Sequence, residues 1–124
     1  MSEGVRRPVV LLVDDEPGIL AALRRSLRRE GYELVAVDSV AAALRALRER
    51  RVDLVLSDHK MPLASGLDLL REMAAHWPGI PAFLLTGWAG ELDPAELRRL
   101  GVRGLIPKPW DDAALKSRLR EALA

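Results

Sequence analysis

The chain has 124 residues, of which 49% are hydrophobic and 30% charged, so we expect one globular domain with a buried core. The net charge of +1 gives no electrostatic reason to expect direct binding of nucleic acid or a membrane surface. The absence of cysteine excludes disulfides, thiolate metal sites and thiol catalysis. The apolar run near the N-terminus ends in acid after about six residues, far short of the roughly 20 that span a bilayer, so we expect a cytoplasmic protein.

Short apolar runs alternate along the chain with segments of helical spacing. Leu20, Leu23 and Leu27 share one face of the first such segment. Strand and helix alternate five times without a linker, which predicts an α/β domain with a parallel sheet and helices on both faces. The continuous apolar character of the runs agrees, because both faces of such a sheet are covered. The predicted strands are residues 9–13, 33–37, 52–57, 81–86 and 104–107.

Helix boundary signals support this alternation. Pro17 suits the first turn of the first helix, and Gly31 is a candidate for its C-terminal stop. Ser39, Asp93 and Asp111 are candidate N-caps of the second, fourth and fifth helices.

Candidate ligand-binding side chains stand at the ends of the first, third, fourth and fifth predicted strands. Asp14 and Asp15 follow the first strand, Asp58 follows the third, Thr86 ends the fourth and Lys108 follows the fifth. Parallel strands end at the same edge of a sheet, where ligands of such folds bind. We therefore expect three carboxylates, a hydroxyl and one of the chain's three lysines to meet there.

This set of side chains favours phosphoryl chemistry. Three clustered carboxylates raise one another's pKa unless a cation is present, and Mg²⁺ prefers oxygen ligands. A lysine ammonium suits a phosphate oxygen. The chain has neither a G-x-x-x-x-G-K-[ST] loop nor a G-x-G-x-x-G after the first strand, so neither a nucleoside triphosphate nor a dinucleotide is held in a familiar way. The phosphate must arrive on another molecule, and a carboxylate can accept it.

Four motifs, "VDDEP", "SDHKMPLASG", "LLTGWA" and "PKPW", resemble those of the receiver domain of two-component response regulators. The resemblance extends from about residue 9 to 123 and implies one receiver domain over residues 1–124. The fold it implies is a flavodoxin-like (βα)5 three-layer sandwich, with a parallel five-stranded sheet of order 2-1-3-4-5.

The resemblance implies a magnesium site next to a phosphoacceptor. Asp58 matches the phosphoacceptor. Asp15, Asp58 and the backbone carbonyl of Lys60 match the direct ligands of Mg²⁺, for which Mn²⁺ is a possible substitute, and Asp14 matches the acid that acts through water. The pair of adjacent aspartates is then tolerable because a divalent cation is expected beside it.

Two further residues receive roles from the resemblance. Thr86 matches the switch hydroxyl and Lys108 the lysine that pairs with the phosphoryl group. The Lys108–Pro109 bond is a candidate cis peptide, and Pro107 is admissible because the fifth strand lies at a sheet edge in the implied order.

The sequence departs from the family pattern around the site. Leu105 replaces the usual aromatic, which puts ring-based coupling of the switch hydroxyl in doubt; Leu105 either packs on the last helix or belongs to another mechanism. Trp88 either limits the approach of water to the phosphoryl group or is an exposed loop aromatic, whereas Gly87 keeps the approach to Asp58 open. The Lys60 side chain either pairs with the phosphate or faces solvent, and His59 is expected in solvent.

The implied partners are a histidine kinase or phosphotransfer protein as phosphodonor and an output domain or effector protein, with a homodimer as a further possibility. An arginine-rich first helix beside the acidic cleft is either a solvated face or a docking surface for the donor. The chain has no room for an output domain, so we expect either a stand-alone receiver or a domain cut from a longer regulator or hybrid kinase. Its richness in Arg, Ala and Leu hints at a bacterial source.

Three other functions compete with a phosphorylation-dependent switch, whose only catalysis is its own phosphorylation and dephosphorylation. An aspartyl-phosphate phosphatase carries a second acid two residues after its nucleophile, where this chain has Lys60. A redox flavodoxin has a Ser/Thr/Gly-rich phosphate loop after the first strand, which is missing. A receiver that acts only by protein contact does not require the full set of acids, hydroxyl and lysine. This phosphorylation-independent interaction module is the main alternative.

Overall fold

The computed structural model describes residues 6–124, and the predicted alternation of strands and helices is confirmed. The elements are β1 (Val9–Val13), α1 (Pro17–Leu27), β2 (Glu33–Val37), α2 (Val40–Glu49), β3 (Leu54–Asp58), α3 (Gly66–His76), β4 (Ala82–Thr86), the 3₁₀ helix η1 (Ala89–Glu91), α4 (Pro94–Arg99), β5 (Gly104–Pro107) and α5 (Asp112–Leu123).

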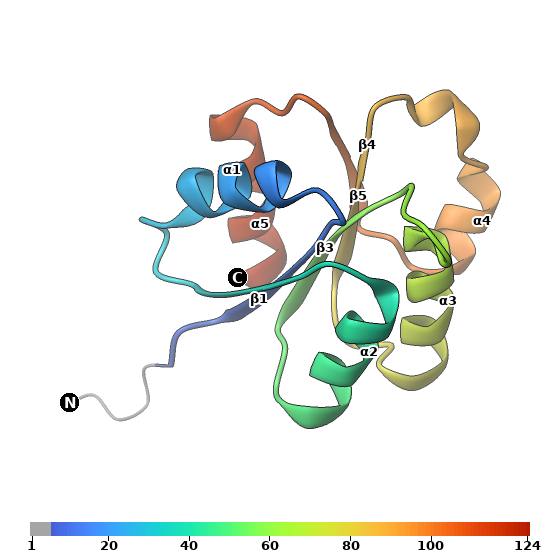
Figure 1. Cartoon of the computed structure of the whole chain (residues 1–124), viewed down its shortest axis with the longest axis horizontal. Helices are drawn as coiled ribbons and strands as arrows, with labels where there is room; N and C mark the ends of the chain where they lie inside the picture. Colours follow the sequence, from blue (N-terminus) through green and yellow to red (C-terminus); the bar gives the residue numbers. More distant parts are fainter. Residues whose placement is uncertain (1–5) are drawn as a thin grey trace.

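All neighbouring strands pair in parallel, in the order β2-β1-β3-β4-β5. Helices α1 and α5 lie on one side of the sheet, and α2, α3 and α4 lie on the other (Figure 1). Parallel neighbours require crossover connections, which α1 to α4 supply, and α5 follows the last strand. The predicted flavodoxin-like three-layer sandwich is therefore confirmed.

Alternate residues of the central strands enter two separate cores. Along β1, Val10 and Leu12 pack with α1 and α5, whereas Leu11 and Val13 pack with α2 and α3. All four are completely buried. Full burial of each such side chain contributes about 1.5–3 kcal/mol, so both faces of β1 anchor the sheet. Such a strand holds the acids that follow it in a fixed place.

The bounds predicted for two strands were slightly wrong. Strand β3 begins at Leu54 rather than residue 52, because Asp53 directs its carboxylate to the backbone N–H of Val9 and to Arg51. The same strand includes Asp58, so this carboxylate is held by sheet pairing rather than by a loop. Strand β4 begins at Ala82, after a proline that offers only its carbonyl to Val55.

The predicted helix caps are confirmed. Ser39, Asp93 and Asp111 each accept a hydrogen bond from a backbone N–H in the first turn of the following helix. Helix α1 ends earlier than Gly31, which lies beyond a further turn with a positive φ of 84°. None of the helices formed by residues 6–124 combines the length and the hydrophobicity that a bilayer span requires.

Candidate functional site

Strand register brings the predicted site residues to one edge of the sheet. Val13 pairs with Ser57, so Asp14, which follows β1, and Asp58, which ends β3, lie at the same level. Thr86 ends β4 opposite Pro107 of β5. The backbone N–H of Lys108 donates to the carbonyl of Thr86 at 2.9 Å, which places this lysine beside the end of β4.

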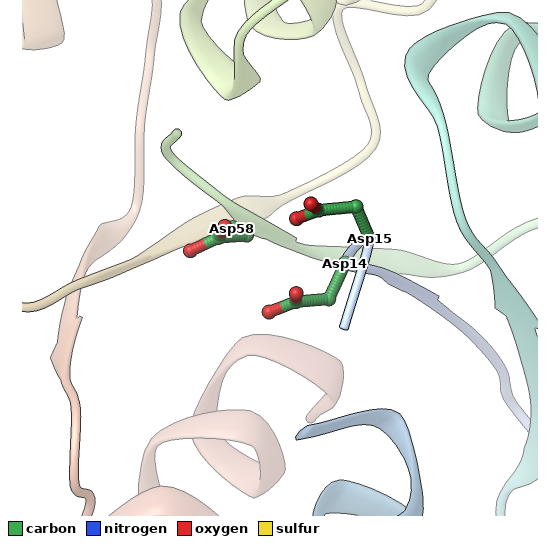
Figure 2. Close-up of side chains that lie close together, drawn as sticks. All are labelled: Asp14, Asp15 and Asp58. Atoms are coloured by element: carbon green, nitrogen blue, oxygen red, sulfur yellow. The ribbon is translucent and has the colours of Figure 1, made fainter. Parts of the chain in front are cut away.

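Three carboxylates converge at this edge. Asp14 and Asp15 follow β1, and Asp58 ends β3; each offers an oxygen that lies within 4.8 Å of those of the other two (Figure 2). Asp14 and Asp58 are buried, whereas Asp15 is exposed. An open cluster of carboxylate oxygens matches the hard-ligand preference of Mg²⁺, which keeps several waters.

The protein alone compensates the negative charge of the Asp14 carboxylate poorly. Burial, reinforced by repulsion from Asp58 and Asp15, raises its pKa to about 6, although a hydrogen bond from the Glu16 N–H and the Lys108 charge oppose the shift. Its Oδ1 accepts that N–H at 2.9 Å, but its buried Oδ2 has no hydrogen-bond partner among the described residues. A buried anionic oxygen without a partner is costly, so this site fits a bound cation.

Lys108 supplies the positive charge nearest to the acids. Its Nζ donates to Asp58 Oδ1 at 2.7 Å and lies 3.9 Å from Asp14 Oδ2. Burial acts to lower the pKa of Lys108, but its hydrogen bond to Asp58 and the charges of Asp58 and Asp14 outweigh burial and raise it. The ammonium is therefore firmly charged. The Lys108–Pro109 peptide bond is cis, as predicted.

An open cavity of about 360 Å³ lies over Asp58. Six residues singled out from the sequence line it, together with three that were not predicted to belong to the site. The lining residues are Asp58, Lys60, Thr86, Gly87, Trp88 and Lys108, joined by Glu16, His59 and Glu91. Asp15 instead lines a neighbouring hollow between the starts of α1 and α2.

The three additional residues differ in how far the sequence could have revealed them. Glu16 is the third acid of the "DDE" run, and this run could have indicated that it belongs to the site. Glu91 has no such signal, because its place on the cavity wall depends on the fold of η1. His59 was predicted to lie in solvent.

The prediction for His59 was wrong. Its ring is half-buried on the cavity wall, and its Nδ1 is buried without a hydrogen-bond partner in the described part of the chain. The cause is the backbone around it. The N–H of His59 donates to the Leu85 carbonyl at 3.0 Å, and its own carbonyl accepts from Gly66 at 2.8 Å. The residue is thus fixed between β4 and the start of α3.

Thr86 and Trp88 form one side of the cavity. The backbone N–H of Trp88 donates to Thr86 Oγ1 at 3.1 Å, which leaves the hydroxyl proton of Thr86 available as a donor. The Trp88 side chain is 68% exposed, yet its ring lies close enough to Gly90 that a Cβ there would come within 2.8 Å of it. Trp88 is therefore both exposed and part of the cavity wall.

Leu105 does not line the cavity. It is half-buried and packs against the core on the side of α2, α3 and α4, together with Leu97 and Leu100. Its carbonyl accepts a hydrogen bond from Arg118 of α5 at 2.5 Å. The Leu105 side chain therefore lies on the face of the sheet that α4 covers. The expectation that it packs on the last helix was wrong.

A sequence model of the response regulator receiver domain matches residues 10–120. The chain belongs to this family. The receiver domain has the strand order predicted from its motifs and an acidic cluster at the carboxyl edge of its sheet.

Curated relatives of this receiver domain include transcriptional regulators. It is 39% identical over 114 residues to the transcriptional regulatory protein GlrR of Escherichia coli K12, covering 92% of this chain and 26% of GlrR. It is 34% identical over 115 residues to KdpE of Mycobacterium tuberculosis H37Rv, covering 93% of this chain and 50% of KdpE. The chain thus spans between a quarter and a half of these relatives.

Solved structures agree with this assignment. The receiver domain of an HD domain-containing protein from Pseudomonas fluorescens Pf-5 superposes with a TM-score of 0.85 at 36% identity, covering 95% of each chain. A CheY-like receiver domain protein from Methanospirillum hungatei JF-1 gives a TM-score of 0.89 at 27% identity, covering 95% of this chain and 94% of that one.

Proposed function

We propose that this receiver domain accepts a phosphoryl group on Asp58 in a magnesium-dependent reaction and switches conformation in response. The observation that supports it most directly is the pairing of a buried acceptor with its cation. Asp58 lines an open cavity beside two further carboxylates, and its Oδ1 lies 2.7 Å from Lys108 Nζ. Phosphoryl transfer depends mainly on such positioning and charge stabilisation.

In the proposed step, a carboxylate oxygen of Asp58 attacks the phosphorus of a phosphohistidine on the donor protein. The O–P bond forms as the P–N bond breaks, and the departing imidazole nitrogen keeps the electron pair and later takes up a proton. The product is an acyl phosphate, which water can hydrolyse to restore the carboxylate and release inorganic phosphate.

The residues of the cavity have distinct proposed roles. Lys108 moves its ammonium from the Asp58 carboxylate to a phosphoryl oxygen, and the hydroxyl of Thr86 donates to another. Asp15, Asp58 and the Lys60 carbonyl would hold Mg²⁺ or Mn²⁺, with Asp14 acting through water. Such an ion would neutralise charge on the transferring phosphoryl group. The unpartnered Oδ2 of Asp14 supports its place beside a cation.

The rest of the proposed function concerns partners. The donor is a histidine kinase or phosphotransfer protein, and the target is an output domain or effector, as the regulators GlrR and KdpE suggest by their names. Formation of a homodimer, a cytoplasmic location and the extent of the domain over residues 1–124 stay predictions, the last because residues 1–5 lie outside the described part. Action by contact alone is the alternative.

Intact mass spectrometry after incubation with acetyl phosphate and Mg²⁺ tests the proposal. We expect an adduct with the mass of one phosphoryl group on the wild type, and none on Asp58→Asn or in the presence of EDTA. If the folded wild type binds Mg²⁺ but takes no phosphoryl group from either acetyl phosphate or a phosphorylated histidine protein, the receiver acts by contact alone.

A further inference from the structure

An ion pair joins two residues that line the cavity. Lys60, in the loop after β3, places its Nζ 2.8 Å from Oε2 of Glu91, the last residue of η1. The Lys60 side chain is 71% exposed and that of Glu91 29%. Exposed pairs of this kind are weak and exchange partners easily, because water competes for both charges.

Both members of this pair face the place where the phosphoryl group would form. Lys60 and Glu91 line the same cavity as Asp58. Two ammonium groups line that cavity among the described residues, those of Lys108 and Lys60. Lys108 is paired with the acceptor Asp58 itself, whereas the more exposed Lys60 is paired with Glu91 and can change partner by movement of its flexible side chain.

Phosphorylation would change the balance between the two possible partners of Lys60. A phosphoryl group carries a charge of about −1.5 to −2 near neutral pH, against −1 for the Glu91 carboxylate. It also offers several acceptor oxygens in a partly enclosed place, where a charge-assisted hydrogen bond is stronger than at the surface. The ammonium of Lys60 is therefore expected to leave Glu91 for the phosphoryl group.

Only a short segment of chain connects Glu91 to α4, so the release of Glu91 would affect the start of that helix. Glu91 ends η1, the next residue, Leu92, is buried in the core, and Asp93 caps α4. The ring movement usual in the family is not available to this chain, because Leu105 stands at that position. An exchange of ion-pair partners provides a physical connection between the cavity and α4 that needs no ring.

We propose that Lys60 is a second phosphoryl-binding cation. Glu91 is then a positioning residue, which pairs with Lys60 until Asp58 is phosphorylated. The inference rests on the proposed function of Asp58. It assigns this receiver domain a way to couple phosphorylation to η1 and α4, and it makes Glu91 a competitor of the incoming phosphoryl group.

The rate of phosphorylation by acetyl phosphate at saturating Mg²⁺ tests this exchange through a double-mutant cycle. Glu91→Gln frees Lys60, so we expect a rate about 3- to 10-fold higher, whereas Lys60→Gln lowers it by a similar factor. Lys60→Gln/Glu91→Gln should behave like Lys60→Gln, and Lys60→Arg should retain most of the wild-type rate. Glu96→Gln is the matched control, because Glu96 pairs with Arg71 at 2.9 Å outside the cavity with a similar exposure of 25%.

Hydrogen–deuterium exchange of peptides covering 88–93 provides the second readout. We expect phosphorylation to speed their exchange several-fold in the wild type, and Glu91→Gln to speed it without phosphorylation. If Glu91→Gln raises the rate equally with and without Lys60, Glu91 acts only as a general negative charge and the inference is wrong. A wild type that takes no phosphoryl group would instead overturn the proposed function itself.

Discussion

At the scale of single residues, the acidic site trades stability for ligand binding. Asp14 is completely buried, one of its oxygens has no hydrogen-bond partner in the described residues, and its pKa is raised to about 6. Without a cation, the ionised carboxylate therefore destabilises the fold. A carboxylate that destabilises the metal-free protein and that a cation would stabilise is typical of a binding site.

Replacing Asp14 should stabilise the metal-free protein. The unfolded chain releases the Asp14 proton near pH 3.8 and the folded protein near 6, so the wild type loses stability as the pH rises between these values. Asp14→Asn should therefore be more stable than wild type by about 2–3 kcal/mol above pH 7, and the difference should vanish below about pH 4. Urea unfolding in EDTA measures it, with Asp15→Asn as an exposed control. A less stable Asp14→Asn at pH 8 would contradict the prediction.

Leu63 stores backbone strain in the loop after β3. Its φ is 72°, and the N–H of Ala64 donates to the carbonyl of Pro62 at 2.8 Å, which closes a three-residue turn around it. This left-handed conformation is unfavourable for a residue with a Cβ, and the fully exposed side chain gains no compensating burial.

Relieving this strain should raise stability. Leu63→Gly is expected to gain about 0.5–1 kcal/mol, because the relief of strain exceeds the extra entropy of glycine in the unfolded chain. Leu63→Ala keeps a Cβ at the same φ and should change stability little. The midpoints of urea unfolding measure the effect, and a Leu63→Gly variant less stable than Leu63→Ala by the entropic cost of glycine would show that the turn carries no strain.

At the scale of elements, the start of α3 is fitted against the phosphoacceptor strand. Ser65 and Asp68 form a capping box, in which each side chain accepts a backbone N–H of the other residue. Gly66, which follows Ser65, lies very close to strands β3 and β4. A Cβ built there would overlap the backbone carbonyl of Asp58 and lie 2.8 Å from Leu84 Cδ2. Helix α3 therefore fixes the backbone that carries Asp58.

A methyl group at Gly66 should disturb both the fold and the site. Gly66→Ala is expected to cost about 1–3 kcal/mol through overpacking and to weaken Mg²⁺ binding, because the Asp58 backbone must shift. Gly79→Ala is the control, since no atom lies within 4 Å of a Cβ built there. Urea unfolding and a Mg²⁺ titration measure the two effects. Unchanged metal affinity in a destabilised Gly66→Ala would separate helix docking from the site.

At the scale of the whole molecule, the site joins segments that are distant in sequence. Asp14, Asp58 and Lys108 come from the ends of three parallel strands, and their proximity exists only in the folded sheet. A cation bound there binds the folded chain in preference to the unfolded one. Binding and folding are thus linked.

Magnesium should therefore stabilise the whole domain. At a Mg²⁺ concentration of 100 times the dissociation constant, the free energy of unfolding should rise by about 2.7 kcal/mol. The Asp15→Asn and Asp58→Asn variants should lose most of this gain. Thermal unfolding with Mg²⁺ or EDTA at constant ionic strength measures it, and equal stabilisation of all three proteins would indicate binding elsewhere.

Much of this receiver domain follows from local features of its sequence. The apolar runs and caps predicted the five strands and five helices, since burial on both faces and capping chemistry act over a few residues. The motifs predicted the strand order, the cis bond at Lys108–Pro109 and the acids that gather at one edge. Parallel pairing makes the last of these unavoidable, because every strand ends at the same side.

Other features were decided only by the tertiary structure. Lys60 pairs with Glu91, which is distant from it in the sequence. This pairing depends on where the fold places η1 beside the cavity. His59 is half-buried because two backbone hydrogen bonds fix it, and Gly66 matters because α3 docks against Asp58. Local sequence determines which side chains are presented and where strands end. Which of them touch depends on loop paths and helix docking, for which sequence spacing carries no signal.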